Sequence, residues 1–596
     1  MTTLQLALAG LRHFRRTHTA VAGGVAAAVA VLAGSFLVGH SVRASLADLT
    51  SRRLGRVDVV VAAEHLFPAQ LAGRLHAKLH GPEVFTGPYA MLTLEAMVAH
   101  DASGRRARRV QLYGVDGGFF KFNVGSRAVT PPGPGDVLLS PDLARELGAN
   151  ADDTLVIRVA RPTDIPLDTL QSAKDEIGQS MRLRVRATLA PEDMGEFSLA
   201  PGQGPVRAVF VDLARLQERL DTSGRVNTLL LRTAEFGVDA EKVKAALRAA
   251  VGPADLGLNI STLADTRTVL VESSTGLLPD ALAATIKESA DAGRWPSASV
   301  FTWLANRLTI GDRVLPYSMV SGLDAAPADP GGIVLNDWAA RDLNAHPGDE
   351  VEIEYFRWAD EGKLVVERAK VRVAGIVPMR GVAADRRLSP EYPGVTESAT
   401  VADWDPPFPI DLKLVRPVDE QYWDRHRATP KAFIPLELAQ RLWRTRYGAI
   451  TSVRIGPVPD ADLDAAATQV AGWLAGRVDP ATTGFTVIDA RRQNLAASAG
   501  ATDFGAYFSY FSFFLMVSAL LLAALFFRLS LEQRLAEIGV LRATGFSIAD
   551  VRRVALVEGA LVSLTGVAAG VALGPEDAAG AVAEIGVVRG DREVRR

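Results

Sequence analysis

Two histidines form the best-spaced pair of metal-type ligands in the chain. His76 and His80 lie four residues apart in a stretch with helical periodicity, so one helix face would offer two imidazoles to a metal ion. The third ligands available nearby, Glu64, His65 and Glu83, stand at no diagnostic spacing. We therefore predict an exposed polar helix face here and no metal site.

The motifs that usually carry catalysis are missing from the sequence. It contains no G-x-x-x-x-G-K-[ST] loop for ATP phosphates, no H-E-x-x-H and no G-x-S-x-G. The absence of cysteine excludes disulfides, thiolate zinc sites and a cysteine nucleophile. A net charge of −3 gives no support to a nucleic-acid partner. We predict neither an enzyme nor a bound cofactor.

Three apolar segments predict a multi-pass α-helical membrane protein. Residues 504–527 are uncharged and would form a helix about 36 Å long, enough to cross a bilayer. Residues 554–574 are interrupted only by Glu558, and residues 19–40 follow a basic N-terminus. The first segment also resembles a cleaved signal peptide, but it is long and Arg43 interrupts the small-residue cleavage pattern. An uncleaved span is therefore the prediction.

Basic residues in the short loops set the predicted orientation. The loop of residues 528–553 carries five arginines and should be cytoplasmic, together with residues 1–18. Residues 41–503 are then extracytoplasmic, and the chain resides in the cytoplasmic (inner) membrane. Residues 575–596 form an atypical tail where a fourth span is expected, which predicts a shortened or altered chain end.

Polar and small residues inside the last span are candidates for helix contacts. A carboxylate within a span is costly, so Glu558 should face protein or reach the interface. It is either a contact to a partner or a boundary residue near the headgroups. Gly566, Gly570 and Gly574 are spaced by four, which places them on one face that another helix can approach closely.

The extracytoplasmic block contains an internal repeat. Gly135 to Ile157 aligns without gaps to Gly331 to Ile353, at a constant offset of 196 residues. Four shorter blocks recur in the same order, and each copy mixes strands and helices. The predicted fold is a large mixed α/β (α+β) domain of two tandem repeats, residues 41–270 and 271–503.

Only the second repeat has an insertion rich in proline and tryptophan, at residues 401–430. Prolines in a stretch poor in strand formers suggest a rigid loop. It would be either a packed Ω-like loop, which we favour, or a surface for a partner.

The loop after residue 527 resembles a known family. Its string Arg534-x-x-Glu537-Ile-Gly-Val-Leu-Arg542-Ala-x-Gly545-x-Ser547 begins as an amphipathic helix and ends at a glycine and a new N-cap serine. Placed before a span that opens Leu556-Val-Glu558-Gly, it is similar to the FtsX/MacB-like permease family of ABC transporters. Ectodomain strings such as Tyr113-Gly-Val-Asp116-x-x-Phe119-Phe resemble that family's periplasmic domain.

The resemblance implies a division of labour between subunits. Two permease copies would pair with two cytoplasmic ABC ATPase subunits, which bind the ATP, and the loop would dock on the ATPase as a coupling helix. The resemblance implies that such a complex serves export, lipoprotein release or mechanotransmission. A periplasmic or outer-membrane protein would be an additional partner. The residues that the resemblance assigns to coupling are Arg534, Glu537, Ile538, Gly539, Leu541, Arg542 and Gly545.

Two alternatives stay open at this point. The same loop could rest on lipid, since a short amphipathic helix binds either a membrane surface or a protein groove. The chain could also be a membrane-anchored extracytoplasmic binding protein whose membrane part does not couple to an ATPase. Neither pattern nor resemblance identifies a cargo.

Overall fold

The computed structural model divides the chain into two compact units, each treated by itself below. It describes residues 3–79, 85–125, 128–162, 178–202, 204–233, 240–324, 331–359, 363–458, 462–498 and 504–594. The helical unit comprises residues 1–51 and 492–596 with a short segment at 200–204, and the remaining residues form the mixed α/β unit.

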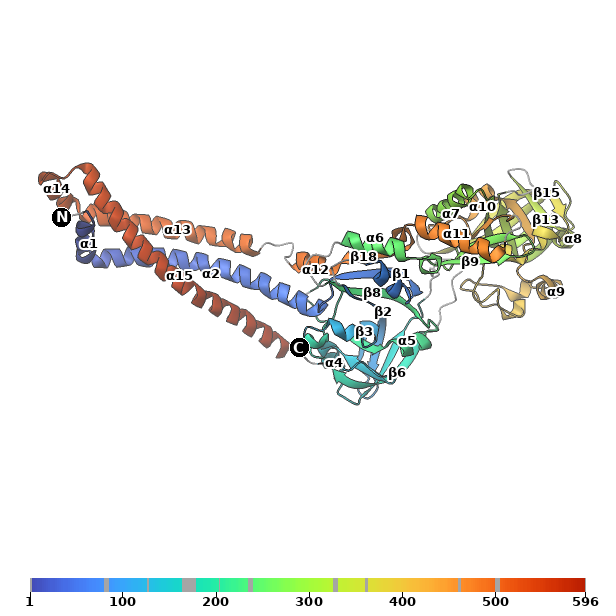
Figure 1. The fold of residues 1–596 in the computed structure, drawn as a ribbon, viewed down its shortest axis with the longest axis horizontal. Helices are drawn as coiled ribbons and strands as arrows, with labels where there is room; N and C mark the ends of the chain where they lie inside the picture. The colour runs from blue at the N-terminus through green and yellow to red at the C-terminus, as the bar shows by residue number, and fades with distance from the viewer. Residues whose placement is uncertain are drawn as a thin grey trace. The chain divides into compact units, whose positions relative to one another are not determined.

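Among the described residues, the helical unit holds three helices that are long and apolar enough to cross a membrane (Figure 1). Their apolar segments are Arg15–Gly34, Met516–Gln533 and Ile548–Leu573. Each helix runs past the predicted span, and in α2 and α13 the flanking residues include Ala, Leu and Arg, which favour helix outside lipid. Its helices are α1 (Thr3–His13), α2 (Arg15–Leu54), α13 (Phe504–Gln533), α14 (Leu535–Ala543) and α15 (Ile548–Val594), the last extending through the predicted tail.

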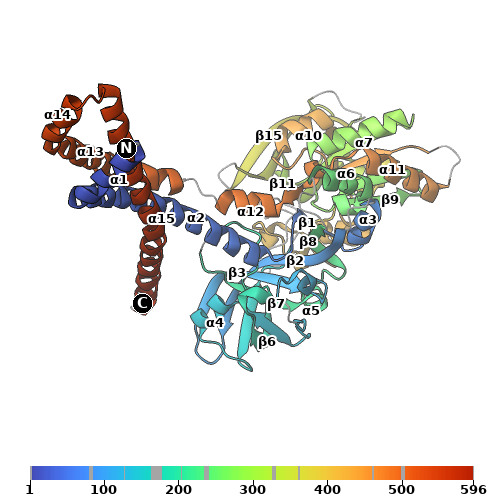
Figure 2. The ribbon, with the colours of Figure 1, turned by 60° about the vertical axis from the view of Figure 1, so that its left-hand side comes forward.

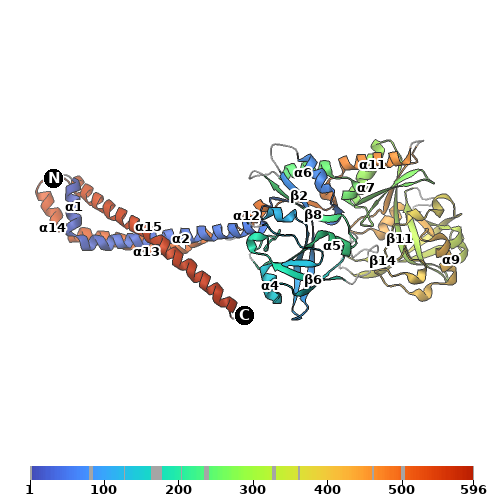
Figure 3. The ribbon, with the colours of Figure 1, turned by 60° about the horizontal axis from the view of Figure 1, so that its bottom comes forward.

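The first sheet of the mixed unit combines a closed barrel with an open extension. Its order is β18-β1-β8-β2-β3-β7-β4-β6-β5, and a further β2–β5 pairing closes six of the strands into a small barrel (Figure 3). Its strands are β1 (Val59–Pro68), β2 (Phe85–His100), β3 (Arg106–Val115), β4 (Asp136–Leu139), β5 (Thr154–Val159), β6 (Gln179–Thr188), β7 (Ala208–Asp212), β8 (Arg225–Thr233) and β18 (Phe485–Asp489).

The second sheet is built in the same way. Its order is β12-β16-β13-β15-β14-β11-β17-β10-β9, and the β12–β11 pairing closes the barrel. Its strands are β9 (Leu258–Leu263), β10 (Thr268–Ser273), β11 (Ser297–Ile310), β12 (Arg313–Leu323), β13 (Gly332–Asn336), β14 (Glu350–Trp358), β15 (Leu364–Val377), β16 (Ala432–Pro435) and β17 (Ser452–Ile455).

The two halves share their topology down to local irregularities. The parallel pair β4–β6 changes register between Val137 and Leu138, and the parallel pair β13–β15 changes register one offset of 196 residues later. Ser140 caps α4 (Pro141–Leu147) by accepting from Leu143 N, and Asn336 caps α8 (Asp337–Leu343) in the same way. The gapless sequence alignment therefore corresponds to equivalent positions in space.

Each half gives its last strand to the sheet of the other half. β9 ends the first half in sequence but pairs with β10 of the second sheet, and β18 ends the second half but pairs with β1 of the first. The predicted boundary between residues 270 and 271 falls inside β10, and the exchanged strands join the two sheets across it. Local strand patterns are the same in both arrangements, so the sequence alone could not reveal this exchange.

One hydrophobic core joins the two sheets. It contains buried residues of β1 and β8 from the first sheet, of β10 and β17 from the second, and of the helices between them, whose ribbons are labelled in Figure 2. These helices are α3 (Leu71–Lys78), α6 (Ala240–Ala250), α7 (Asp280–Ala292) and α11 (Leu463–Arg477). The remaining helices of this unit are α5 (Leu213–Arg219), α9 (Pro417–His426), α10 (Leu436–Trp443) and the start of α12 (Ala490–Ser498).

The chain enters and leaves the mixed unit at one point. Arg491, just after β18, donates from Nε to Asp58 Oδ1 at 2.5 Å and from Nη2 to Gly55 O at 2.7 Å. Both partners precede β1, the strand beside β18. Arg491 therefore links the segment that follows α2 to the segment that leads towards α13, at the edge of the first sheet.

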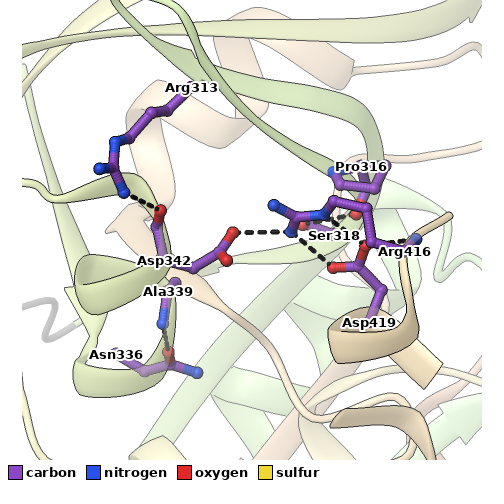
Figure 4. A network of polar contacts seen from close by, with 8 residues as sticks. All are labelled: Arg313, Pro316, Ser318, Asn336, Ala339, Asp342, Arg416 and Asp419. Carbon is purple, nitrogen blue, oxygen red and sulfur yellow. Dashed lines mark hydrogen bonds and ion pairs between the residues drawn. The ribbon is translucent and has the colours of Figure 1, made fainter. Parts of the chain in front are cut away.

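The proline- and tryptophan-rich insertion is packed, and it contains a helix that the sequence analysis did not predict. Between β15 and β16, Trp404, Phe408 and Trp423 are buried in the core of the second half. Arg416 anchors the segment (Figure 4): its Nη2 donates to Asp342 Oδ2 at 2.7 Å, and its Nε donates to Asp419 Oδ2 at 2.9 Å. Proline at the first position of α9 and acidic residues in its first turn explain the helix.

Candidate functional site

The candidate site lies where α13, α14 and α15 follow one another. Arg534 interrupts the helix between α13 and α14. Gly545 has φ +97°, a conformation that favours glycine, and Ser547 Oγ accepts from Asp550 N at 3.2 Å to begin α15. The predicted helix end and new N-cap are confirmed.

A buried ion pair connects α14 to the last apolar helix. Arg534 donates from Nη1 to Glu558 Oε2 and from Nη2 to Glu558 Oε1, the second at 3.3 Å. Glu558 is only 2% exposed, and Arg534 Nε lies 3.3 Å from Glu537 Oε2. Glu558 therefore contacts protein, as its cost in a span requires, and its partner lies within this chain.

The N-terminal helix α1 and Phe14, the residue that follows it, cover this ion pair. The Arg534 guanidinium lies 4.2 Å from the ring centroid of Phe14, close enough for a cation–π contact. Gly10 packs directly on the pair, since a Cβ there would overlap Glu558 Oε1 and lie 2.5 Å from Arg534 Nη2. A side chain at position 10 would displace the pair, so glycine permits the close approach of α1.

A cavity of about 330 Å³ lies beside the pair. Leucine, isoleucine, valine and alanine side chains dominate its lining, with the two ion-pair residues and His13 at its polar part. Ile538 and Leu541 of α14 face this cavity. The lining residues are Leu6, Ala9, Gly10, His13, Leu531, Arg534, Glu537, Ile538, Leu541, Val551, Val554, Ala555 and Glu558.

The other side of α14 is exposed. Leu535 and Val540 are 66% and 64% exposed, and Arg542 and Gly539 are exposed as well. The helix therefore has an inner apolar face towards the cavity and an outer face with two bare aliphatic side chains and an arginine. An exposed aliphatic pair beside a cation is suited to contact with a protein or a lipid surface.

Two of the three glycines spaced by four in the last span contact α2. A Cβ at Gly566 would lie 2.8 Å from Ala22 O, and a Cβ at Gly570 would lie 2.6 Å from Ala26 O. The side of α15 with small residues therefore allows the backbone of α2 to approach. The surroundings of Gly574 lie outside the described side chains.

The histidine pair of the mixed unit is not part of any metal site that the structure describes. His76 lies on α3, is exposed and contacts Gly87 O through Nδ1 at 2.8 Å, whereas His80 lies outside the described residues. In the described part of the chain, no three His, Asp or Glu side chains form a group that could hold a metal ion.

Gly10, Phe14 and the pairing of Arg534 with Glu558 were not predicted. The loop motif placed Arg534 among the contacts to a partner, but the structure turns its side chain inward. The N-terminal stretch TLQLALAGLRH has helical periodicity that could have predicted α1, although not its contact with α15.

Two family models match the sequence. The MacB-like periplasmic core domain matches residues 20–250, and the FtsX-like permease C-terminal model matches residues 509–575. The crystal structure of the periplasmic region of MacB from Actinobacillus actinomycetemcomitans aligns with 40% of this chain and 95% of its own, at 10% identity and a TM-score of 0.22. No curated protein sequence matches the chain.

Proposed function

Because the chain belongs to the FtsX/MacB-like permease family, we propose that it is the transmembrane subunit of an ABC transporter-type complex. A separate cytoplasmic ATPase would bind and hydrolyse ATP, and this chain would convert that work into movement of its extracytoplasmic domain. We further propose that two copies of the chain pair, and that residues 41–503 are two copies of one structural unit. The shared topology of the two sheets supports the duplication.

The buried contact between Arg534 and Glu558 carries the proposal. It joins α14 to α15, so a displacement of α14 would reach the span through an ion pair rather than through a flexible loop. The exposed outer face of α14 would receive the ATPase, with Glu537 and Arg542 as polar contacts and Gly539 allowing close approach. Ile538 and Leu541 would hold the helix on the protein, and Gly545 would set its end.

The five arginines of residues 528–553 support a cytoplasmic position for this face. A topology reporter inserted at residue 540 should therefore respond from the cytoplasmic side. A signal from outside the cell would contradict the proposed orientation.

Co-purification with an ABC ATPase expressed from the same genome tests the function. We expect the wild-type chain to retain the ATPase in detergent and Arg542→Glu to lose it, because the change reverses the charge on the docking face. Arg528→Glu is the matched control, since Arg528 is equally exposed but lies on α13. If both variants retain the ATPase, docking does not use α14, and if the wild type retains none, a membrane-anchored binding protein is the better assignment.

A further inference from the structure

A small cavity lies beneath the insertion of the second half. It is bounded by the start of β12, the segment before α9, α9 itself and the residues that lead into β16. Its volume is about 20 Å³, enough for one particle the size of a water molecule. Its lining includes Tyr317, Trp404, Asp419, Tyr422, Arg427 and Lys431.

Lys431 is a buried cation in this lining. It is 5% exposed, and its Nζ lies 4.9 Å from the ring centroid of Tyr422 and 5.2 Å from that of Trp338. The structure gives its ammonium group neither a hydrogen bond nor an ion pair to any described residue. Ring faces offset part of the cost of burying a cation, but they leave its N–H donors without an acceptor.

A second donor in the same lining also lacks an acceptor. Trp404 is 6% exposed, and its Nε1 has no hydrogen-bond partner among the described residues. The neighbouring indole of Trp423 is different, since it donates to Ser398 O at 3.1 Å. The unsatisfied groups at this cavity are therefore donors, and donors require an occupant that accepts.

The charges around the cavity favour an anion over a neutral acceptor. Its lining contains the carboxylate of Asp419 and the cations Arg427 and Lys431. The Asp419 carboxylate already accepts from Arg416 Nε and Nη2, both at 2.9 Å (Figure 4). The carboxylates of Asp419 and Asp342 both accept hydrogen bonds from Arg416 and act on Lys431 only through space. The three cations Arg416, Arg427 and Lys431 thus outnumber these two carboxylates.

Backbone strain marks the same place. Tyr317 has φ +39° and Arg427 has φ +53°, and both are non-glycine residues that line the cavity. Such conformations cost free energy and collect at functional sites, where the surrounding contacts hold them. Burial also lowers the pKa of Lys431 to about 8, and the charges of Asp419 and Asp342 offset this only in part.

We propose that this cavity binds a single small anion of chloride size, held by the Lys431 ammonium group and the Trp404 indole N–H. The anion satisfies both donors and fits the available volume. Because the lining comes from the barrel and from the insertion, the bound anion also fastens the insertion to the barrel. The site is independent of the membrane-side contacts and of any ATPase.

Thermal unfolding of the full-length protein in detergent tests the site. Tryptophan fluorescence is followed in sodium chloride, sodium bromide and sodium gluconate at equal ionic strength and pH 7. We expect the unfolding temperature of the wild type to be higher by about 2 °C in both halides than in gluconate, because a ligand bound only to the folded state stabilises it. Lys431→Met should abolish the difference, and Trp404→Phe should reduce it.

Lys413→Met is the matched control, since Lys413 is an exposed lysine of the same insertion. It should keep the full halide effect. Equal unfolding temperatures in halide and gluconate for the wild type, or the same halide effect in Lys431→Met, would overturn the proposal and leave a water molecule as the occupant. If Lys431→Met does not fold, wild-type crystals grown in bromide decide: an anomalous peak between Lys431 and Trp404 supports the site, and its absence overturns it.

Discussion

Adding one methyl group at Gly10 should release α1 from the last apolar helix. The Cβ of Gly10→Ala would overlap Glu558 Oε1 and press on Arg534 Nη2, so the buried ion pair must shift. Overpacking of this kind costs about 1–3 kcal/mol. Alanine gains up to ~1 kcal/mol in helix propensity over glycine. At a charged pair we expect the upper end of that steric cost, about 3 kcal/mol. Subtracting the gain in helix propensity leaves a net loss of about 2 kcal/mol, which is roughly a 30-fold change in the equilibrium between docked and detached α1.

Cysteine labelling measures this change directly, because the chain has no cysteine of its own. Ala7 on α1 is fully buried, so a cysteine placed there reacts with a maleimide only when α1 detaches. We expect Gly10→Ala to accelerate labelling of Ala7→Cys by about 30-fold relative to the Ala7→Cys protein alone, if detachment precedes labelling in a rapid equilibrium. Gly24→Ala is the matched control, since nothing lies within 4 Å of a Cβ at Gly24.

A double-mutant cycle separates the steric effect from a general loss of stability. In a Glu558→Ala background the overlapping carboxylate is gone and the Arg534 side chain is free of its partner, so the effect of Gly10→Ala on the labelling rate should be much smaller. Equal labelling of the Gly10→Ala and Gly24→Ala proteins would refute the argument that the ion pair holds α1. An unchanged effect of Gly10→Ala in the Glu558→Ala background would refute it as well.

Three other substitutions probe the buried charges. Arg534→Met leaves Glu558 unpaired and should destabilise the helical unit by about 3–5 kcal/mol, whereas Arg528→Met should cost under ~1 kcal/mol, as measured by unfolding in detergent. Arg416→Met removes the partner of buried Asp419, so protease cleavage within residues 378–431 should accelerate, and the exposed Arg425→Met should not change it. In halide-free buffer, the pKa of about 8 for Lys431 in the folded protein lies below its value in the unfolded chain, so the unfolded chain binds more protons. The free energy of unfolding should therefore rise by up to ~3 kcal/mol between pH 8 and 10.5. Lys431→Met should remove this dependence on pH, and an unchanged dependence would contradict the burial of an unpaired ammonium group at position 431.

Much of the fold follows from local patterns in the sequence. The apolar segments gave the three membrane-type helices, and the gapless alignment of Gly135–Ile157 with Gly331–Ile353 corresponds to a shared local structure. The capping residue Ser547 could be predicted because a cap is decided within one helical turn. These features depend on interactions between near neighbours in the chain.

Features that depend on distant contacts could not be predicted. Arg534 and Glu558 belong to different helices, and α1 comes from the opposite end of the chain, so no spacing reveals that Gly10 touches both. The exchange of β9 and β18 leaves every strand pattern unchanged. The helix α9 had local signals, but the surrounding prolines and tryptophans suggested an irregular loop instead.

The exchanged edge strands have a consequence for biogenesis. β1 appears early as the chain is made, but its edge partner β18 comes some 400 residues later. During that interval the first half exposes an unpaired strand edge to the compartment in which it folds. Neither half can complete its sheet alone. A chain that ends before residue 485 would therefore keep an unpaired strand edge at β1, which favours aggregation or degradation. The first sheet is therefore complete only after residue 489 has been made.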